Sequence, residues 1–199
     1  MASKIEKNNL DAKSRILNTA MRLFNKQGVH HTGTEQLIAE SDVAKMTFYK
    51  HFPTKSKLVC EFFKLKDQIW FDTLNSYIDQ ADGAENKILS LFDALEGWFS
   101  EPDYYGCPFV RGLSDFDASN DPEIAACVNK HFSETTKLVS RLLTEMKVKS
   151  EEVNELTTKI LTLITGAIVL AHATNSPAAA LVNKKVAKEL LNAAIGKNG

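Results

Sequence analysis

The sequence predicts an all-α protein. Almost every segment of its 199 residues repeats apolar side chains at the spacing of a helix, and almost none alternates apolar and polar residues as a strand does. Apolar residues make up 44% of the chain, which is enough for one sizeable core or for a small domain joined to a larger one. From these observations we expect about nine helices, arranged as a small three-helix domain and a larger helical bundle.

The first predicted helix spans residues 10–27. It should end at Gly28, because glycine readily adopts the backbone conformation that follows a helix C-terminus. Helical spacing places one apolar stripe along this segment. The stripe consists of Ile16, Leu17, Ala20, Leu23 and Phe24.

The next segment predicts a second helix over residues 33–41, followed by a tight turn. Thr32 and Glu35 have the spacing of a capping box, in which each side chain binds the other residue's backbone N–H. The turn includes Asp42, since aspartate tolerates a left-handed backbone. The residues that we expect to be buried here are Leu37, Ile38 and Ala39, with Val43 filling the corner.

The third predicted helix, residues 44–52, has two different faces. Phe48 and Phe52 are four residues apart and share one face, which can anchor the helix. A DNA major groove admits one α-helix, and hydrogen-bond donors on the other face could reach phosphates or base edges there. The spacing therefore predicts a DNA-reading helix-turn-helix, although solvated charges on an ordinary helical hairpin would show the same spacing. The donors are Lys45, Thr47, Tyr49 and Lys50.

Pro53 ends the third helix, and Thr54 is a good N-cap for the next one. Lys55 would then lie at a helix N-terminus, where its ammonium and the free backbone N–H groups could grip a phosphate. The segment 102–120 is the least regular in the chain. The later predicted helices span residues 54–80, a segment through 88–99, then 122–147, 150–173 and 177–196, with Asp121, Ser150 and Ser176 as caps.

Charge is distributed unevenly along the chain. Residues 1–70 contain 12 Lys and Arg against 7 Asp and Glu, a net charge of +5, whereas the remaining residues contain 12 against 18, a net charge of −6. Neutralising phosphates supplies most of the sequence-independent affinity for DNA. A basic N-terminal region that also contains the helix-turn-helix is therefore consistent with DNA binding.

Nineteen residues in this N-terminal region match a known pattern: Arg15, Ile16, Leu17, Ala20, Leu23, Phe24, Gly28, Thr32, Thr34, Ile38, Ala39, Val43, Lys45, Thr47, Tyr49, His51, Phe52, Lys55 and Leu58. Together they resemble the N-terminal signature of TetR-family transcriptional regulators. The resemblance implies a homodimeric repressor that binds a palindromic operator and releases it when a small molecule enters the C-terminal domain. It also implies a DNA-binding domain over residues 1–53 and a ligand-binding and dimerisation domain over residues 54–199.

The resemblance also implies which side chains contact DNA. These are Thr34 and Gln36 on the second helix, then Lys45, Thr47, Tyr49, Lys50 and His51 on the third, and Lys55 beyond it. The chain departs from the family where Asp42 and Met46 stand in place of glycines. We include Met46 among the candidate contacts, because it could touch a thymine methyl group or instead block a close backbone approach.

The C-terminal region should supply the dimer interface and an effector pocket. We expect the last two helices to form the interface, although their apolar faces could equally be the core of a monomeric bundle. An aromatic-rich interior can bind an apolar or aromatic small molecule, while aromatic residues at helical spacing often only fill a core. The candidate ligand contacts are Phe63, Trp70, Phe92, Trp98, Cys107, Phe109, Arg111 and His131.

Three cysteines, Cys60, Cys107 and Cys127, lack metal-type spacing and indicate a reducing cytoplasm rather than a disulfide framework. Cys107 lies in a Tyr-Gly-Cys-Pro segment that resembles a motif in part of the family, and an accessible thiol there would make it an electrophile or oxidant sensor.

The sequence predicts no cofactor, no metal site, no catalytic motif and no signal peptide. The longest apolar stretch, residues 160–173, is shorter than the roughly 20 residues that cross a bilayer, so we expect no membrane role. Three alternatives stay open: a helical protein–protein adaptor, a small helical enzyme, and an activator instead of a repressor.

Overall fold

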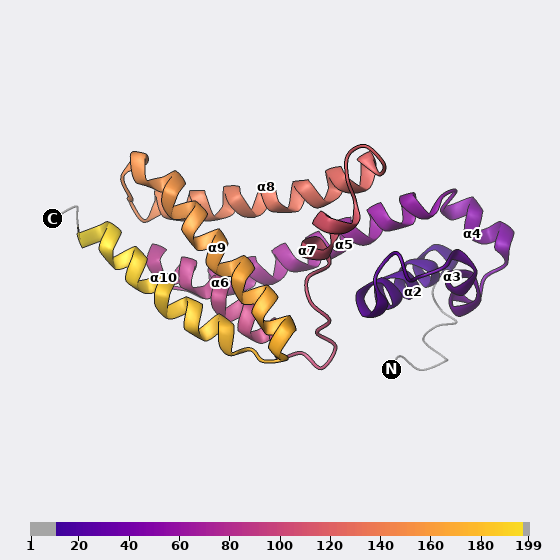
Figure 1. The fold of residues 1–199 in the computed structure, drawn as a ribbon, viewed down its shortest axis with the longest axis horizontal. Coiled ribbons are helices and arrows are strands. Elements are labelled where there is room, and N and C mark those ends of the chain that lie inside the picture. The colour runs from indigo at the N-terminus through magenta and orange to yellow at the C-terminus, as the bar shows by residue number, and fades with distance from the viewer. Residues whose placement is uncertain (1–10, 197–199) are drawn as a thin grey trace. The chain divides into compact units, whose positions relative to one another are not determined.

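The computed structural model describes residues 11–196 of the chain, so the predicted helix start at residue 10 lies outside the described residues. Within that range the chain forms nine α-helices and no strand, as the sequence predicts (Figure 1). The first four are α2 (Ala12–Gln27), α3 (Thr34–Ser41), α4 (Lys45–His51) and α5 (Lys55–Asp79). The others are α6 (Ala84–Phe99), α7 (Pro108–Asp115), α8 (Pro122–Glu145), α9 (Ser150–Thr174) and α10 (Ala178–Gly196).

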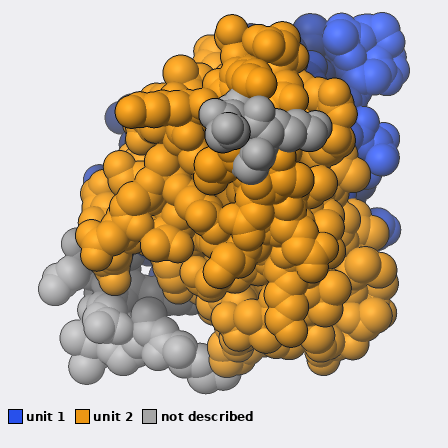
Figure 2. Space-filling model, turned by 90° about the vertical axis from the view of Figure 1, so that its left-hand side faces the viewer, with its two compact units in different colours: residues 1–66, 108–129 blue, residues 67–107, 130–199 orange. Residues whose placement is uncertain are grey.

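Packing divides the chain into two compact units, which Figure 2 colours separately. Unit 1 comprises residues 1–66 and 108–129, and unit 2 comprises residues 67–107 and 130–199. Helices α5 and α8 each contribute their first turns to unit 1 and their later turns to unit 2. This division differs from the predicted boundary between residues 53 and 54, which separates two functions and stays a prediction.

In unit 1, α2 packs against both α3 and α4. Asp11 caps α2 by accepting a hydrogen bond of 2.8 Å from the backbone N–H of Ser14. The helix ends at Gly28 with a positive φ of 84°, as predicted. Phe24 lies on the buried stripe of α2 and meets Phe62 of α5 edge-on, at 5.3 Å between ring centroids. Leu17, which the sequence assigned to that stripe, is only half-buried.

The turn between α3 and α4 takes the predicted left-handed conformation at Asp42, with φ 54° and ψ 51°. The carbonyl of Asp42 accepts a hydrogen bond of 2.8 Å from Arg15, which ties the turn to α2. Ala39 is exposed, contrary to the prediction. Successive residues are about 100° apart around a helix, so three in a row do not share the face that packs on α2.

The predicted capping box is absent. Gly33 is the N-cap of α3, and no side chain bonds to that helix end. Thr32 is buried instead and donates a hydrogen bond of 2.7 Å to the carbonyl of Gly28, so it closes the loop after α2. The predicted Ser150 cap is also wrong, because Lys149 is the N-cap of α9 and Ser150 is its first helical residue. Thr54, in contrast, caps α5 as expected by accepting from Lys57 N–H at 3.2 Å.

Unit 2 is a helical bundle in which α9 and α10 lie side by side and both pack against α6 (Figure 1). Small residues of α10, including Ala180 and Ala187, are fully buried and allow this close packing. Lys184 of α10 forms an ion pair with Asp93 of α6, at 2.5 Å and 2.7 Å to the two carboxylate oxygens. Asn183 also donates a hydrogen bond of 2.7 Å to the carbonyl of Leu163 in α9.

Candidate nucleic-acid interface

Helix α4 is anchored by the two aromatic residues that the sequence predicted. Phe48 is fully buried, and Phe52 is 2% exposed, directly after the helix. Their ring centroids are 6.4 Å apart, and both rings lie in the core of unit 1. Because one face of α4 is held in this core, the opposite arc is fixed in position on the surface.

That arc carries the candidate DNA contacts. Helical spacing places Lys45, Met46, Tyr49 and Lys50 next to one another on it. Met46 is 87% exposed and Tyr49 is 40% exposed, so a highly exposed apolar side chain stands beside two amines and a phenol. Thr47 is half-buried, which leaves it less accessible than its neighbours. An exposed helix face with donors and one methyl-contacting group suits the edges of bases in a major groove.

Lys45 is not free in this structure. Its ammonium forms an ion pair with Glu35 of α3 at 2.8 Å, and both side chains are largely exposed. The hydrogen bond to Glu35, followed by the charge of Glu35, raises the pKa of Lys45. The carboxylate of Glu35 beside Lys45 would oppose an approaching phosphate.

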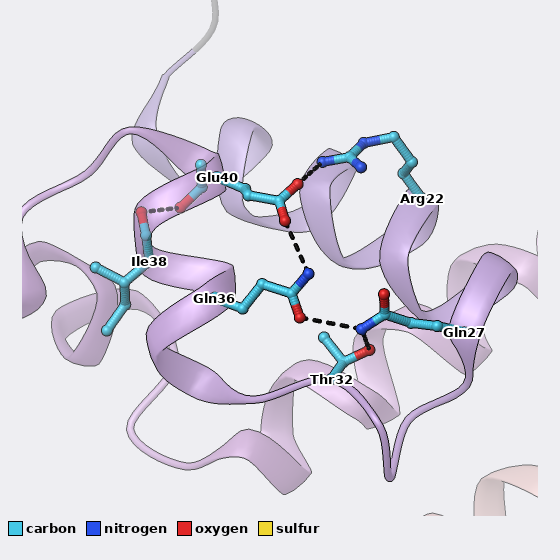
Figure 3. A network of polar contacts seen from close by, with 7 residues as sticks. Arg22, Gln27, Thr32, Gln36, Ile38 and Glu40 are labelled. Atoms are coloured by element: carbon cyan, nitrogen blue, oxygen red, sulfur yellow. Dashed lines mark hydrogen bonds and ion pairs between the residues drawn. The ribbon is translucent and has the colours of Figure 1, made fainter.

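Gln36 belongs to a polar network that joins α2 to α3 (Figure 3). Gln27 donates a hydrogen bond of 3.0 Å to Gln36, and Gln36 donates one of 2.8 Å to Glu40. Arg22 closes the chain with an ion pair to Glu40 at 2.5 Å. The amide of Gln36 is therefore engaged in holding α3 in place, while Thr34, the other predicted contact on α3, is half-buried.

Lys55 lies at the first position of α5, as predicted, but its ammonium points into unit 1. It donates a hydrogen bond of 2.7 Å to the carbonyl of Val29, in the loop before α3. Burial lowers the pKa of Lys55. In this structure the residue ties the start of α5 to that loop.

Sequence reasoning missed the residues that position the site. Arg22 and Gln27 had no assigned role, and Glu35 was interpreted only as a helix cap. The available signal was the polar side chains of α2 and α3, among which Gln36 and Glu40 show the four-residue spacing of a pair within one helix. Such a signal does not identify partners that come from another helix.

The eight predicted ligand contacts are divided between the two units. Phe63, Phe109 and Arg111 belong to unit 1, and the other five belong to unit 2. Phe63 and Phe109 are in contact, with ring centroids 5.3 Å apart, and Arg111 donates a hydrogen bond of 3.0 Å to the carbonyl of Asn25. In unit 2, the rings of Trp70 and Trp98 lie 5.1 Å apart, and both side chains are half-buried. The remaining three are Phe92, Cys107 and His131, which are all buried.

His131 forms a buried polar pair in unit 2. Its Nδ1 lies 2.7 Å from a carboxylate oxygen of Asp67, and its ring is 6.0 Å from that of Phe71. Burial lowers the pKa of His131, and this effect outweighs the opposing one of Asp67. Cys107 directly precedes α7 but is only 7% exposed. It therefore lacks the accessible thiol that the sensor hypothesis required.

The fold and the exposed face of α4 define a helix-turn-helix transcriptional regulator. Residues 16–62 match the family model described as bacterial regulatory proteins, tetR family. Residues 84–183 match the model described as transcriptional regulator LmrA/YxaF-like, C-terminal domain. The chain belongs to the TetR family of transcriptional regulators.

Two regulators from Bacillus subtilis are similar to most of the chain. The uncharacterized HTH-type transcriptional regulator YxaF is 29% identical over 163 residues, which cover 81% of this chain and 85% of YxaF. The HTH-type transcriptional regulator LmrA is 28% identical over 167 residues, which cover 81% of this chain and 86% of LmrA. The crystal structure of SCO4454, a TetR-family regulator from Streptomyces coelicolor, has the same fold, with a TM-score of 0.83 at 20% identity. The structural match covers 92% of this chain and 95% of SCO4454.

Proposed function

We propose that this regulator is a homodimeric repressor that binds a palindromic operator and releases it when a small molecule binds the C-terminal bundle. The observation that carries the DNA-binding part is α4, whose buried Phe48 fixes an exposed arc with Lys45, Tyr49 and Lys50. We assign base contacts to Met46, Tyr49 and Lys50, and phosphate contacts to Lys45 and His51. Gln36 and Lys55, whose polar ends are bonded within unit 1, mainly position the site.

The proposed dimer interface lies on α9 and α10. Six large apolar side chains are exposed on these two helices, and a shallow groove runs along α9 past Gly166. The whole of α9, Ser150–Thr174, is long and apolar enough to cross a membrane by length and composition alone. Our sequence-based expectation rested on only the shorter apolar stretch 160–173 within it. We favour a second copy of the chain as the cover, because α9 lies within the matched regulator domain and packs on α6 and α10. The six side chains are Val169, Leu170, Leu181, Val182, Val186 and Ile195.

Symmetry supports this choice of partner. One helix-turn-helix reads one half-site, and a two-fold pair reads two half-sites that are separated by one or more helical turns of DNA. A homodimer therefore predicts an operator with matching inverted halves. It would act in the cytoplasm, where the chromosome of a bacterium is accessible.

The effector part of the proposal rests on the half-buried aromatic residues of unit 2. Trp70 and Trp98 present partly exposed rings to each other, and Trp98 also meets Tyr104 edge-on at 5.0 Å. Flat ring surfaces of this kind suit an apolar or aromatic molecule. Ligand binding would favour an arrangement in which α5 moves the α4 helix in each copy of the dimer. The distance between the two α4 helices would then no longer match the distance between successive major grooves. DNA would then weaken ligand binding by the same factor.

Selection of bound duplexes from a random DNA pool tests the DNA-binding and dimer proposals together. We expect a palindrome, with half-sites whose centres are separated by about one helical turn or a multiple of it. A single asymmetric site would contradict the dimer, and no enrichment at all would contradict DNA binding. For the effector, equal affinity of a ligand for the free and the DNA-bound protein would contradict the proposed linkage.

A further inference from the structure

A groove of about 560 Å³ lies within unit 1, next to the C-terminal end of α4. His51, Phe52 and Pro53 line one side of it, and two cysteines, Cys60 of α5 and Cys127 of α8, line another. The remaining lining residues are charged: Lys13, Lys57, Glu61, Lys64 and Glu123. The functions proposed above use neither cysteine.

The two cysteines form the second of two successive contacts between α5 and α8. The first is the ion pair of Lys57 with Glu123, at 2.8 Å and 2.9 Å to the two carboxylate oxygens. Cys60 follows Lys57 by three residues and Cys127 follows Glu123 by four, so each thiol lies one turn further along the same helix face. Both thiols line the same groove, and Cys127 is near enough to affect the ionisation of the Cys60 thiol.

The two thiols differ in their surroundings. Cys60 is 6% exposed, whereas Cys127 is half-buried and open to the groove. Burial, followed by the neighbouring Cys127, raises the pKa of Cys60 to about 12, so this thiol stays protonated at neutral pH. Lys64, which also lines the groove, is paired with Glu61 at 2.8 Å, so exposure is what distinguishes the two thiols. Cys127 is therefore the group that meets an oxidant first.

We propose that Cys60 and Cys127 are a redox-active pair that a peroxide converts into an intrachain disulfide. The sulfur of Cys127 attacks a peroxide oxygen, the O–O bond breaks, and a sulfenic acid and water form. The sulfur of Cys60 then attacks the sulfur of Cys127, an S–S bond forms, and the hydroxyl group leaves as water with the Cys60 proton. Two thiols lose two electrons in total, and one peroxide is reduced to two waters. A dithiol reductant reverses the reaction.

The disulfide would shift the position of α4, the helix proposed to contact DNA. An S–S bond is about 2.05 Å long, so its formation draws the start of α5 toward α8 and narrows the groove. The end of α4 lines that groove and is joined to α5 by only three residues, Phe52, Pro53 and Thr54. This consequence rests on the proposed DNA-binding function: oxidation shifts α4 and lowers operator affinity by about tenfold or more, the cost of one lost base contact.

The chemistry is tested on the purified full chain with hydrogen peroxide, followed by alkylation and peptide mapping by mass spectrometry. We expect a linked pair of peptides containing Cys60 and Cys127, with Cys107 still alkylated. Cys107→Ser is the matched control and should give the same linked pair. Cys60→Ala should stop at a sulfenic acid on Cys127, which dimedone traps, and Cys127→Ser should form neither product. Three alkylatable thiols after peroxide, a bond to Cys107, or a bond between two chains would overturn the proposal.

The regulatory consequence is tested with the duplex selected above. Oxidised wild-type protein should bind it about tenfold more weakly than reduced protein, and dithiothreitol should restore binding. Cys127→Ser should bind like the reduced wild type with or without peroxide. A disulfide that forms without changing affinity would overturn the switch. If the reduced protein binds no duplex, the proposed function fails, while the peptide map still decides the thiol chemistry.

Discussion

Lys45 on the exposed arc of α4 is paired with Glu35 of α3 at 2.8 Å. The pair forms because the packing of α3 and α4 brings two different helices together, so the 3.6-residue period of either helix does not predict it. That period does separate the buried Phe48 and Phe52 from the exposed Lys45 and Tyr49.

Replacing Glu35 by Gln should raise affinity for duplex DNA. The change frees the ammonium of Lys45 and removes a negative charge beside the proposed phosphate path. Exposed ion pairs contribute about 0.2–1 kcal/mol, so we expect about a one- to fivefold increase at low salt and a steeper salt dependence. Fluorescence anisotropy of a labelled duplex, titrated at several salt concentrations, measures both the affinity and its salt dependence. The matched control is Glu134→Gln in unit 2, which breaks a similarly exposed pair with Lys137 and should leave affinity unchanged; equal effects of the two changes would contradict the account.

His131 should make the protein less stable in mild acid. Burial lowers its pKa in the folded state below the unfolded value of about 6.5. Between these two pKa values the unfolded chain binds more protons, so the contribution of His131 is present above about pH 6.5 and is lost as the pH falls through the lower value. Urea unfolding at several pH values between 7 and 5 should show a weaker pH dependence for His131→Gln than for the wild type. Exposed His51→Gln is the control, and parallel curves for wild type and His131→Gln would refute the assignment.

Among the elements, most helices were predictable, including the short α3 and α4, whose predicted ends lie within one residue of the observed ones. The sequence predicted α5, α8 and α9 with their ends within a few residues, because the period repeats over many turns. It missed α7, whose eight residues include Pro108 and Gly112. A helix of this length depends on its neighbours more than on its own propensity. The capping box at Thr32 failed for a related reason, since that side chain found a partner in the loop after α2.

Gly112 provides a test of how α7 is held. A Cβ atom there would lie 2.8 Å from Val128 Cγ2 and 3.3 Å from the ring of Phe63. Val128 is buried and β-branched, so it cannot move aside easily. We expect Gly112→Ala to lower the free energy of unfolding by about 1–3 kcal/mol, despite the better helix propensity of alanine.

The control for that substitution is Gly33→Ala. Gly33 precedes α3 with φ −78°, and a Cβ atom there would meet nothing within 4 Å. Urea unfolding should show a change of less than about 1 kcal/mol at this position. If Gly112→Ala proved as stable as the wild type, the close packing of α7 on α8 in unit 1 would not require glycine at position 112.

At the scale of the whole molecule, the sequence predicted an all-α regulator but not the composition of its packed units. Residues 108–129 join the N-terminal unit although they lie far along the chain, and no local pattern encodes that association. The predicted effector residues were therefore divided between two units. In contrast, the DNA-binding surface was largely predictable, because it is built from consecutive residues of a single short helix.

The proposed dimer predicts a distinct effect of charge on α9. Leu170→Glu should give a monomer by analytical ultracentrifugation and should weaken binding to the palindromic duplex by about a hundredfold, because the two half-sites are no longer bound together. Leu113→Glu is the matched control: Leu113 on α7 is 52% exposed, and Leu170 is 53% exposed. This control should keep the oligomeric state of the wild type. A monomeric wild type, or a Leu170→Glu dimer, would contradict the proposed interface.

The proposed DNA-binding function places the exposed arc of α4 in the major groove of duplex DNA. Its most direct test is the affinity of the purified, reduced protein for duplex DNA, titrated from low to high salt. We expect binding at low salt that weakens linearly on a double-logarithmic plot, by about 0.9 in slope for each phosphate contacted, and a loss of affinity in Tyr49→Phe and Lys50→Ala without loss of folding. No binding to any duplex at low ionic strength, or full affinity in both variants, would contradict the claim.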